Sequence, residues 1–562
     1  MKKLFLLGII FLLMSGCFNR AEKDETQEAA VILAGETAGG NPETVSTPEP
    51  TPEPTPEPTP EPTPAPTPSP WEVFQPSPLP ETDPATFPRF SFSNRLNEEM
   101  TLFPIHFGMP EDYTDVVGVT TFRGNNFRNN PTWGNVVVTA GELEIKYEIR
   151  TGSLGRWTGV GWTGQPVIIQ WEDDVRRMMN LNEHMREKDG LIEVIQGAMD
   201  GYIYFFELET GEQTRPRIHF GDVIKGGVTV DARGYPLLYV GQGDLVGTSR
   251  FGYYIFCLIT GKEIFHINGR DPFSHRQWGA FDANPLFDTA QDRAIIAGEN
   301  GVLYSVVLNT DFDRDAGTIS INPTISRYTY TGSRRLGIEN SPAALGHYVF
   351  FADNAGWIQC VDLHTLEPVW VMDSGDDTDA TLVLDWEEEN QRLAIYTGTE
   401  VDLLGQAGDA HIRKLDAATG ETLWMYSIRC GFNDDSNGGI LATPVVGEHD
   451  ISHLAIFSVA RTLNRASYGT ILAFDKETGE IVWEFAMPGF GWSSPVALYT
   501  EDGTSYLVVS DSGGQMFLLR GTTGEQLHRI NVGANVEASP AVFGNTLVVG
   551  TRGNRILGIA IK

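Results

Sequence analysis

The fold is decided by the stretch Leu415–Trp424, which reads LDAATGETLW, because it recurs along the chain. A close copy, FDKETGEIVW, runs from Phe474 to Trp483. In both copies an acidic residue caps a tight turn, Gly supplies the positive φ that the turn needs, and alternating residues resume a strand. The Trp after the turn places a large apolar plate on one strand face. Weaker copies lie at residues 208–212, 258–262, 361–370 and 521–525.

Two further elements recur with this turn. The first is a hairpin rich in Asn, Asp and Gly between apolar strands, at residues 198–204, 298–304, 352–357 and 511–515. The second is a small polar residue followed by Pro and apolar residues, which suits the first residue of a strand. It occurs as Gln165-Pro166, Asn284-Pro285, Ser341-Pro342, Thr443-Pro444, Ser494-Pro495 and Ser539-Pro540. The period is about 50 residues, within the range of propeller repeats.

One unit therefore predicts a four-stranded antiparallel sheet, which cannot bury both faces alone. Radial stacking of such units predicts an all-β fold, a β-propeller. Counting the repeat units along the chain gives eight blades, or seven if one degenerate unit is an insertion. After Pro540 the chain supplies only three strands, so we expect Leu143–Ile149 to provide the fourth and close the ring.

The first residues resemble a bacterial lipoprotein signal. Lys2 and Lys3 precede an apolar run, Leu4–Met14, that is too short to span a bilayer, and Cys17 follows at once. Cys17 is then the expected lipidation site, and the alternative is a simple secretory signal with a chance Cys. Two acyl chains on that Cys suffice for stable membrane attachment.

The expected domain organisation follows from composition. Residues 1–17 form the signal, and residues 18–88 form an acidic tether whose centre repeats Thr-Pro-Glu-Pro. Such dense proline favours an extended polyproline II spacer. Residues 89–142 lead into the propeller, which spans residues 143–562. The net charge of −34 argues against nucleic acid as a partner, because binding to phosphate polymers rests on Lys and Arg.

The turn motif Asp-x-x-Thr-Gly-Glu-x-x-Trp resembles the pyrroloquinoline quinone (PQQ)-like repeat. The family includes quinoprotein dehydrogenases and BamB-like lipoproteins of the cell envelope. The lead-in Thr121–Arg128, TFRGNNFR, is also similar to that of exported PQQ-like propellers. The resemblance covers residues 118–562 and implies the fold more firmly than an activity.

The enzymes of this family hold PQQ with Ca²⁺ from carboxylate and amide ligands, and many carry a vicinal disulfide. The three cysteines beyond Cys17 are Cys257, Cys360 and Cys430, and none is adjacent to another. No calcium ligand set of the family matches defined positions of this chain. PQQ and Ca²⁺ are therefore the cofactors of the alternative hypothesis, and no cofactor is expected under the main one.

Polar residues just before the innermost strands should line the mouth of the propeller channel. A ring of carboxylates and amides with one Trp suits a cation, a sugar or a peptide end. The alternative is a hydrated channel with ordinary polar residues at strand starts. The candidates are Asp282, Asn284, Glu339, Asn340, Asp379, Asn437, Trp492 and Glu537.

A second candidate site is the acidic loop with Asp311, Asp313 and Asp315, whose alternating carboxylates are similar to the start of a calcium loop. Its Gly317 falls one place late for an EF-hand, and Asn322 stands where that loop needs Glu. A solvated acidic loop without metal is the alternative.

These observations predict a non-catalytic binding or scaffold module, anchored by lipid to the outer face of the cell membrane and reaching toward the cell wall. Its expected partners are an envelope protein or a cell-wall glycan. The alternatives are a PQQ- and Ca²⁺-dependent dehydrogenase and a propeller that binds or acts on polysaccharide.

Overall fold

The computed structural model describes residues 69–97, 104–247, 250–332, 336–405, 408–432, 437–463 and 468–562. The chain divides into two compact units, Met1–Pro66 and Thr67–Lys562. The first unit, with the predicted signal peptide, Cys17 and most of the tether, lies outside the described residues. Within the described ranges, no helix has the length and apolar character needed to cross a membrane.

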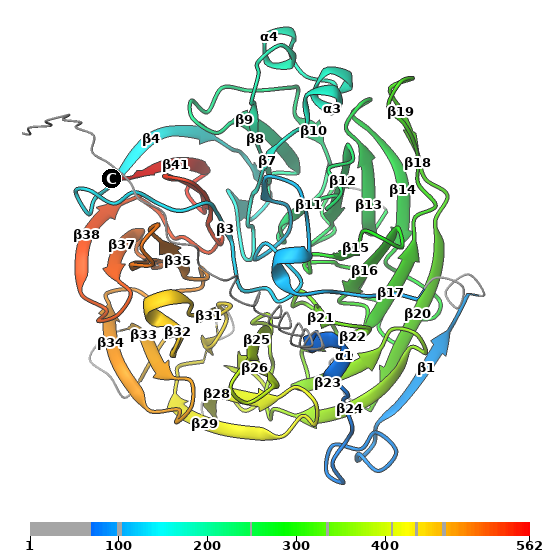
Figure 1. Ribbon diagram of the computed structural model, residues 1–562, viewed down its shortest axis with the longest axis vertical. Coiled ribbons are helices and arrows are strands. Elements are labelled where there is room, and N and C mark those ends of the chain that lie inside the picture. Colours follow the sequence, from blue (N-terminus) through cyan, green and yellow to red (C-terminus); the bar gives the residue numbers. More distant parts are fainter. Residues whose placement is uncertain are drawn as a thin grey trace, which may run out of the picture. The chain divides into compact units, whose positions relative to one another are not determined.

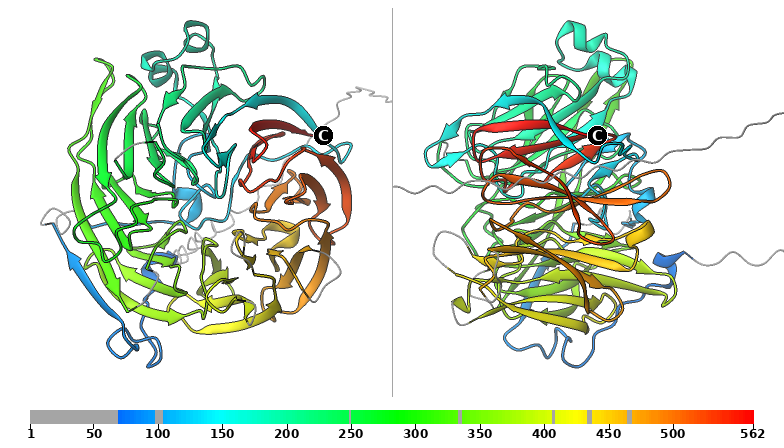
Figure 2. Two further views of the ribbon diagram at one scale, coloured as in Figure 1. Left: turned by 180° about the vertical axis from the view of Figure 1, so that it is seen from behind. Right: turned by 90° about the vertical axis from the view of Figure 1, so that its left-hand side faces the viewer.

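The second unit is an all-β ring of eight blades around a central axis, which confirms the predicted propeller (Figures 1 and 2). The innermost strands of the blades surround the axis and the outermost strands form the rim (Figure 1). Apolar side chains from facing sheets fill the space between neighbouring blades. Stacked sheets bury both faces in this way, as the repeat requires.

Blades 1 to 4 follow one another along the chain. Blade 1 contains β2 (Gly118–Val119), β7 (Val167–Gln170), β8 (Ile192–Gly197), β9 (Tyr202–Glu207) and β10 (Ile218–His219). Blade 2 contains β11 (Val228–Val230), β12 (Leu237–Gly241), β13 (Gly252–Cys257) and β14 (Lys262–Asn268). Blade 3 contains β15 (Leu286–Asp288), β16 (Arg293–Gly298), β17 (Val302–Val307) and β20 (Thr324–Thr331), with β1 (Ser91–Arg95) at its outer edge. Blade 4 contains β21 (Ala343–Leu345), β22 (Tyr348–Ala352), β23 (Trp357–Asp362) and β24 (Glu367–Asp373).

Blades 5 to 8 complete the ring. Blade 5 contains β25 (Val383–Glu387), β26 (Arg392–Gly398), β28 (Asp409–Asp416) and β29 (Thr422–Arg429). Blade 6 contains β31 (Val445–Val446), β32 (Leu454–Ala460), β33 (Gly469–Asp475) and β34 (Ile481–Met487), joined by β27 (Glu400–Val401) and β30 (Gly438–Gly439). Blade 7 contains β35 (Val496–Tyr499), β36 (Ser505–Ser510), β37 (Gln515–Arg520) and β38 (Gln526–Asn531). Blade 8 contains β39 (Ala541–Phe543), β40 (Thr546–Thr551), β41 (Arg555–Ile561) and β4 (Leu143–Arg150).

The remaining elements are short and lie outside the blades. They are the hairpins β5 (Ser153–Leu154) with β6 (Trp157–Thr158) and β18 (Asp311–Asp313) with β19 (Thr318–Ser320), the helices α1 (Pro70–Val73), α3 (Asp173–Met178) and α4 (Glu183–Arg186), and the 3₁₀ turns η1 (Pro110–Asp112) and η3 (His449–Ile451).

The ring closes as the sequence predicts. Strand β4 pairs antiparallel with β41, so the N-terminal strand completes the last blade and leaves no free edge there. The lead-in contributes more than a connection, because β3 (Thr132–Trp133) pairs in parallel with β39 and β1 extends blade 3. Phe74, just after α1, is buried in the core of blade 4.

The repeated Trp and Gly join blades 4, 5 and 6 each to the next blade. The indole N–H of Trp370 donates to the Ala417 carbonyl of blade 5 at 2.9 Å, and Trp424 donates to Lys476 of blade 6 at 2.9 Å. The indole also lies against the turn glycine, so a Cβ on Gly420 would stand 2.8 Å from Trp370. Gly420 therefore serves both the positive φ of the turn and the packing of the neighbouring blade.

Replacing Trp370 with Phe is expected to lower the free energy of unfolding by about 1–3 kcal/mol, because it leaves the buried Ala417 carbonyl without its donor and opens a small cavity. Urea denaturation measures the change. Trp386→Phe is the matched control, since the buried Nε1 of Trp386 has no hydrogen-bond partner among the described residues. An equal loss in both variants would show that the inter-blade bond contributes nothing.

The small polar residue before Pro forms a hydroxyl ring around the axis. The backbone N–H of Asn284 donates to Ser341 Oγ at 2.9 Å, and that of Ser341 donates to Thr381 Oγ1 at 3.0 Å. The series continues from blade to blade, and its later members are Thr443, Ser494 and Ser539. The starts of blades 3 to 7 are thus each held by a side chain of the next blade, which explains the recurring Ser or Thr.

Two arginines of the lead-in bind backbone carbonyls at the blade starts, next to the hydroxyl ring. Arg123 donates from Nη1 to the Pro495 carbonyl at 2.7 Å and from Nη2 to the Pro444 carbonyl at 3.0 Å. Arg128 donates to the Pro342 carbonyl at 2.8 Å and to the Asn284 carbonyl at 2.9 Å. Both side chains are fully buried. This pair, Arg123 and Arg128, is called the arginine plug below.

Candidate functional site

Eight equivalent positions, one in each blade, lie two residues before the recurring small polar residue, or before Gly227 and Thr381 in the two blades that lack the Pro. They are Thr163, Lys225, Asp282, Glu339, Asp379, Leu441, Trp492 and Glu537. Blades 3, 4 and 5 all carry a carboxylate here, so three acidic side chains from neighbouring blades face one region of the axis.

A second set of polar residues follows the second strand of the same three blades. The backbone N–H of Glu299 donates to Ala280 O at 3.0 Å, and the N–H of Glu400 donates to Asp377 O at 3.0 Å. Asn354 makes the equivalent bond in blade 4. In each blade this bond joins the hairpin to the segment that enters the innermost strand, so the two polar side chains lie together.

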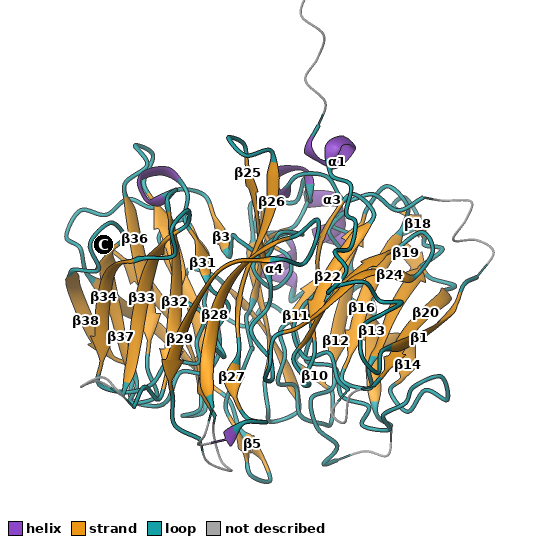
Figure 3. Ribbon diagram, turned by 90° about the horizontal axis from the view of Figure 1, so that it is seen from below, coloured by secondary structure: helices purple, strands orange, loops and turns teal. Residues whose placement is uncertain are grey.

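The result is two carboxylate trios, which we call the axial cluster. The first trio is Asp282, Glu299 and Glu339, and the second is Asp377, Asp379 and Glu400. Within each trio, one oxygen from each residue lies within 4.8 Å of the others. β27, which carries Glu400, lies on the face opposite α1, as does β5 (Figure 3). The arrangement can hold a cation with oxygen ligands alone.

Burial and like charge make full ionisation of the axial cluster unfavourable. Burial, opposed by Lys225, raises the pKa of Asp282 to about 6, and burial with the charges of Asp402 and Glu339 raises the pKa of Glu400 to about 8. Burial is also the main reason that the pKa values of Glu299, Asp377 and Asp379 lie well above their ordinary values, with neighbouring carboxylates adding to it.

Few positive charges face these carboxylates. Lys225 Nζ lies 3.1 Å from Asp282 Oδ2 and stands over the Trp157 ring at 5.7 Å. Arg276 reaches Glu299 only at 3.8 Å and donates to the Leu336 carbonyl. Four buried oxygens have no hydrogen-bond partner among the described residues: Asp282 Oδ1, Glu299 Oε1, Asp377 Oδ1 and Asp379 Oδ1. Buried acceptors without partners are rare in native proteins, so these oxygens point to a missing ligand.

The amide candidates have other partners. Asn284 Nδ2 donates to Thr229 Oγ1 at 2.8 Å, within the hydroxyl ring region. Asn340 Nδ2 donates to the carbonyls of Ala352 and Thr378 at 2.9 and 2.8 Å, and therefore joins blades 4 and 5. Asn437 differs, because its side chain hydrogen-bonds to Glu400 at the edge of the axial cluster.

Trp492 and Glu537 lie at ring positions outside the axial cluster. Glu537 Oε2 accepts from Arg552 at 2.7 Å, so its charge is already paired. Trp492 packs against Phe490 with ring centroids 5.9 Å apart, and its buried Nε1 has no partner among the described residues. From the opposite side Trp162 Nε1 donates to the Leu441 carbonyl at 3.0 Å. The ring positions are thus acidic on blades 3 to 5, whereas Trp492 of blade 7 and Trp162 of blade 1 place indole rings at this level.

The acidic loop forms an exposed hairpin, in which Asp311 and Asp313 lie on β18 and Asp315 lies in the turn. Asp313 accepts the Ala316 N–H at 2.8 Å, which stabilises the turn. The groups of described residues whose ligating atoms converge do not include these three aspartates. Metal binding there stays a prediction.

Sequence reasoning missed Lys225, Glu299, Asp377 and Glu400. The signal for Lys225 was its place two residues before Gly227, which corresponds to the place of Asp282 before Asn284 and of Glu339 before Ser341. Glu299 lies in a stretch assigned to a hairpin turn, and only the bond of its N–H to Ala280 shows that it faces the axis.

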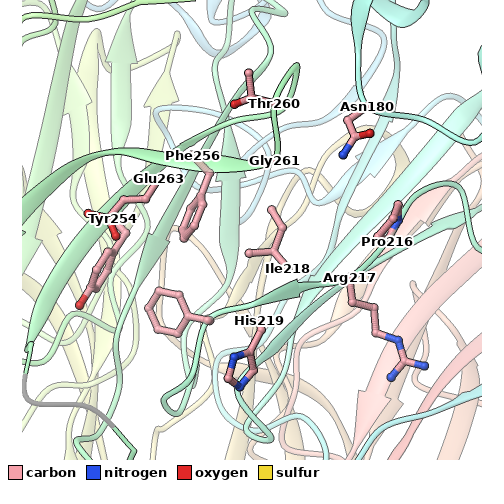
Figure 4. A pocket seen from close by; sticks show the side chains of 11 residues that line it. Asn180, Pro216, Arg217, Ile218, His219, Tyr254, Phe256, Thr260, Gly261 and Glu263 are labelled. Atoms are coloured by element: carbon pink, nitrogen blue, oxygen red, sulfur yellow. The ribbon is translucent and has the colours of Figure 1, made fainter.

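An outer pocket of about 400 Å³ lies between blades 1 and 2 (Figure 4). Arg217, His219, Phe220 and Tyr254 are among the side chains that line it. Phe220 packs edge to face on Tyr254 with centroids 4.9 Å apart, and Arg217 stands over Tyr204 at 4.7 Å. The aromatic rings of this pocket therefore pack the two blades together. The axial cluster is the stronger candidate for a functional site.

Comparison with known proteins agrees with this architecture. The family profile described as outer membrane protein assembly factor BamB matches residues 467–562, which contain the outer strands of blade 6, all of blade 7 and the C-terminal strands of blade 8. No curated protein matches the sequence. BamB from Moraxella catarrhalis is 18% identical, with 75% of this chain and 98% of that chain covered and a TM-score of 0.45. The quinohemoprotein alcohol dehydrogenase ADHIIG from Pseudomonas putida HK5 is 13% identical, with 79% and 80% covered and a TM-score of 0.50.

The likeness to the dehydrogenase concerns the fold alone. The repeated Asp-x-x-Thr-Gly-Glu-x-x-Trp turn, the eight blades and the profile match identify the chain as a β-propeller of PQQ-like repeats.

Proposed function

We propose that the protein is a non-catalytic binding module of the cell envelope, whose axial cluster holds a hard divalent cation of the Ca²⁺ type. The observation that carries this proposal is the set of four buried, unpartnered carboxylate oxygens converging from blades 3 and 5 of the described ring. Ca²⁺ takes six to eight oxygen ligands from carboxylates, amides and water, which is the chemistry that the axial cluster offers.

The cation has a structural consequence for the ring. The first trio joins blades 3 and 4, and the second belongs to the start of blade 5 and the end of its second strand. A cation bound by the first trio offsets the repulsion among its carboxylates and fixes blades 3 and 4 relative to each other, and one bound by the second trio joins the start of blade 5 to the end of its second strand. The ring would then present a rigid face to an envelope protein or glycan, in keeping with the lipoprotein-like signal and the BamB profile match.

The residues fit PQQ less well than they fit the cation. The quinone is itself a polycarboxylate, and the family's enzymes place an arginine beside it. Here the described cations that face the axial cluster, Lys225 and Arg276, already bind Asp282 and the Leu336 carbonyl. Arg123 and Arg128 donate to backbone carbonyls of the blade starts. We therefore place no catalytic step in this ring.

Calcium titration of the purified protein tests the proposal. We expect saturable binding near neutral pH, and at least a tenfold weaker affinity in Glu339→Gln/Asp379→Asn, equivalent to about 1.4 kcal/mol. Glu537→Gln is the matched control, because Glu537 holds the same ring position but pairs with Arg552. Isothermal titration calorimetry gives the affinities.

Absence of binding to the wild type, or equal affinity in the double variant, would contradict the proposal for the axial cluster. The non-catalytic assignment has its own test, which adds PQQ together with Ca²⁺. A quinone absorbance band with alcohol-dependent dye reduction would instead establish a quinoprotein dehydrogenase.

A further inference from the structure

A second group of metal-ligating side chains lies in blade 4, at the end of β21 opposite the one that Glu339 of the axial cluster precedes. His347 occupies the turn between β21 and β22, and His364 follows Asp362 at the end of β23. His106 of the lead-in is adjacent, because Phe107 pairs with Gly346 through hydrogen bonds of 2.7 and 2.8 Å. Three of the eleven histidines of the chain therefore gather at one corner.

The corner brings two imidazoles and a carboxylate together. The rings of His347 and His364 are parallel, with centroids 4.2 Å apart and an interplanar angle of 6°. His347 Nε2 lies 3.8 Å from Asp362 Oδ2, beyond a direct hydrogen bond. One ligating atom from each of the three residues lies within 4.8 Å of the others. A metal lies in the plane of each imidazole that binds it, so His347 must turn out of the parallel stack before all three ligating atoms come to the roughly 2.0–2.2 Å that Zn²⁺ requires.

Neighbouring groups orient two of these side chains. Asp362 Oδ1 accepts the backbone N–H of His364 at 2.7 Å, which fixes the carboxylate and leaves Oδ2 toward His347. His364 Nε2 lies 3.2 Å from the Ile105 carbonyl. A carbonyl only accepts, so Nε2 carries the proton and Nδ1 keeps its lone pair. Metal-ligating histidines are commonly oriented by such a bond from the other ring nitrogen.

The surroundings suit metal binding in one more respect. The side chains are half-buried, with 28% of His347 and 22% of Asp362 exposed, so an ion can enter while part of its hydration is removed.

We propose that His347, Asp362 and His364 form a binding site for a borderline transition-metal ion, with Zn²⁺ as its natural occupant. Two nitrogens and one oxygen, completed by water, match the donor set of such ions and differ from the all-oxygen set of the axial cluster. The bond between His364 and the Ile105 carbonyl links the bound ion to the lead-in, so the metal would fasten that segment to blade 4.

The experiment is a competition titration of Zn²⁺ against a chromophoric chelator, in millimolar Ca²⁺ so that the axial cluster is occupied. We expect one equivalent of Zn²⁺ to bind the wild type, and at least a tenfold weaker affinity in His347→Ala and in His364→Ala. His275→Ala is the control, because His275 is exposed and lies elsewhere on the ring. Asp362→Asn keeps the shape of the site and tests the carboxylate without removing a ring.

Co²⁺ supplies a readout that a merely structural effect would not produce. Co²⁺ in a four- or five-coordinate site with two imidazoles absorbs far more strongly in the visible than aqueous Co²⁺, and we expect this stronger d–d absorption in the wild type and in Glu339→Gln/Asp379→Asn but not in His364→Ala. Zn²⁺ affinity that is unchanged in both histidine variants would overturn the proposal. Retained Zn²⁺ binding in the axial double variant separates this site from the calcium site, so the two proposals fail independently.

Discussion

Replacing Arg128 with Met is expected to lower the free energy of unfolding by about 3–5 kcal/mol, an exceptionally large effect for a single substitution. The guanidinium donates to the carbonyls of Pro342, Asn284, Pro285 and Phe122 at 2.8 to 3.2 Å. Met fills much of the volume but donates nothing, so buried carbonyls at the starts of two blades lose their partners. Each such buried group costs about 1–3 kcal/mol.

Urea denaturation followed by tryptophan fluorescence measures this effect. Arg177→Met is the matched control, because Arg177 is 57% exposed and its pair with Asp173 spans 3.4 Å on a helix surface. That surface pair should contribute under about 0.5 kcal/mol. If Arg128→Met were as stable as the control variant, the arginine plug would not hold the blade starts together.

Without metal, the protein is expected to lose stability as the pH rises from about 4 to about 8. A carboxyl whose pKa is raised on folding binds more protons in the folded state, so its contribution is present below its unfolded pKa and lost as the pH passes through the folded value. Asp282 and Glu400 of the axial cluster, with pKa values of about 6 and about 8, define this window. Asp353, a buried residue of the β22–β23 hairpin whose pKa burial raises to about 7, adds to the same trend.

The expected loss is at least about 3 kcal/mol, since a pKa that differs by one between the folded and the unfolded chain corresponds to about 1.4 kcal/mol. Burial lowers the pKa values of His266, His347 and His411, and these histidines act against the trend because their folded forms bind fewer protons than the unfolded chain. The raised carboxyls of the ring interior shift further and set the direction. Urea midpoints in EDTA, measured at intervals across the window, give the profile. Glu400→Gln should flatten it, and a wild-type profile that rises toward the alkaline end would contradict the assignment of protons to the axial cluster.

Most of the fold can be predicted from the sequence, because the repeated residues are those that local turns and strands require. Gly420 and Trp424 stand where a turn and the next strand require them, and the spacing of the blades made Leu143–Ile149 the expected closing strand. The role of Ser341 or Thr443 in the hydroxyl ring was not predictable, because each bonds across to a neighbouring blade. The same holds for Arg128, since an arginine in a loop is ordinarily exposed.

The candidate site was partly predictable, because some of its residues hold a fixed place in the repeat. Asp282, Glu339 and Asp379 were found from their place before an innermost strand, whereas Asn284 and Asn340 share that place but bind neighbouring backbone. Glu299 and Glu400 come from another part of the repeat, and they meet the first set only through tertiary bonds to Ala280 and Asp377.

The most direct test of the axial cluster counts the protons released when Ca²⁺ binds near neutral pH in weakly buffered solution. Carboxyls that hold protons in the free protein must lose them to become ligands, so we expect about one proton or more for each Ca²⁺ bound, and less in Glu400→Gln. Ca²⁺ binding without proton release, or no binding at all, would contradict the account.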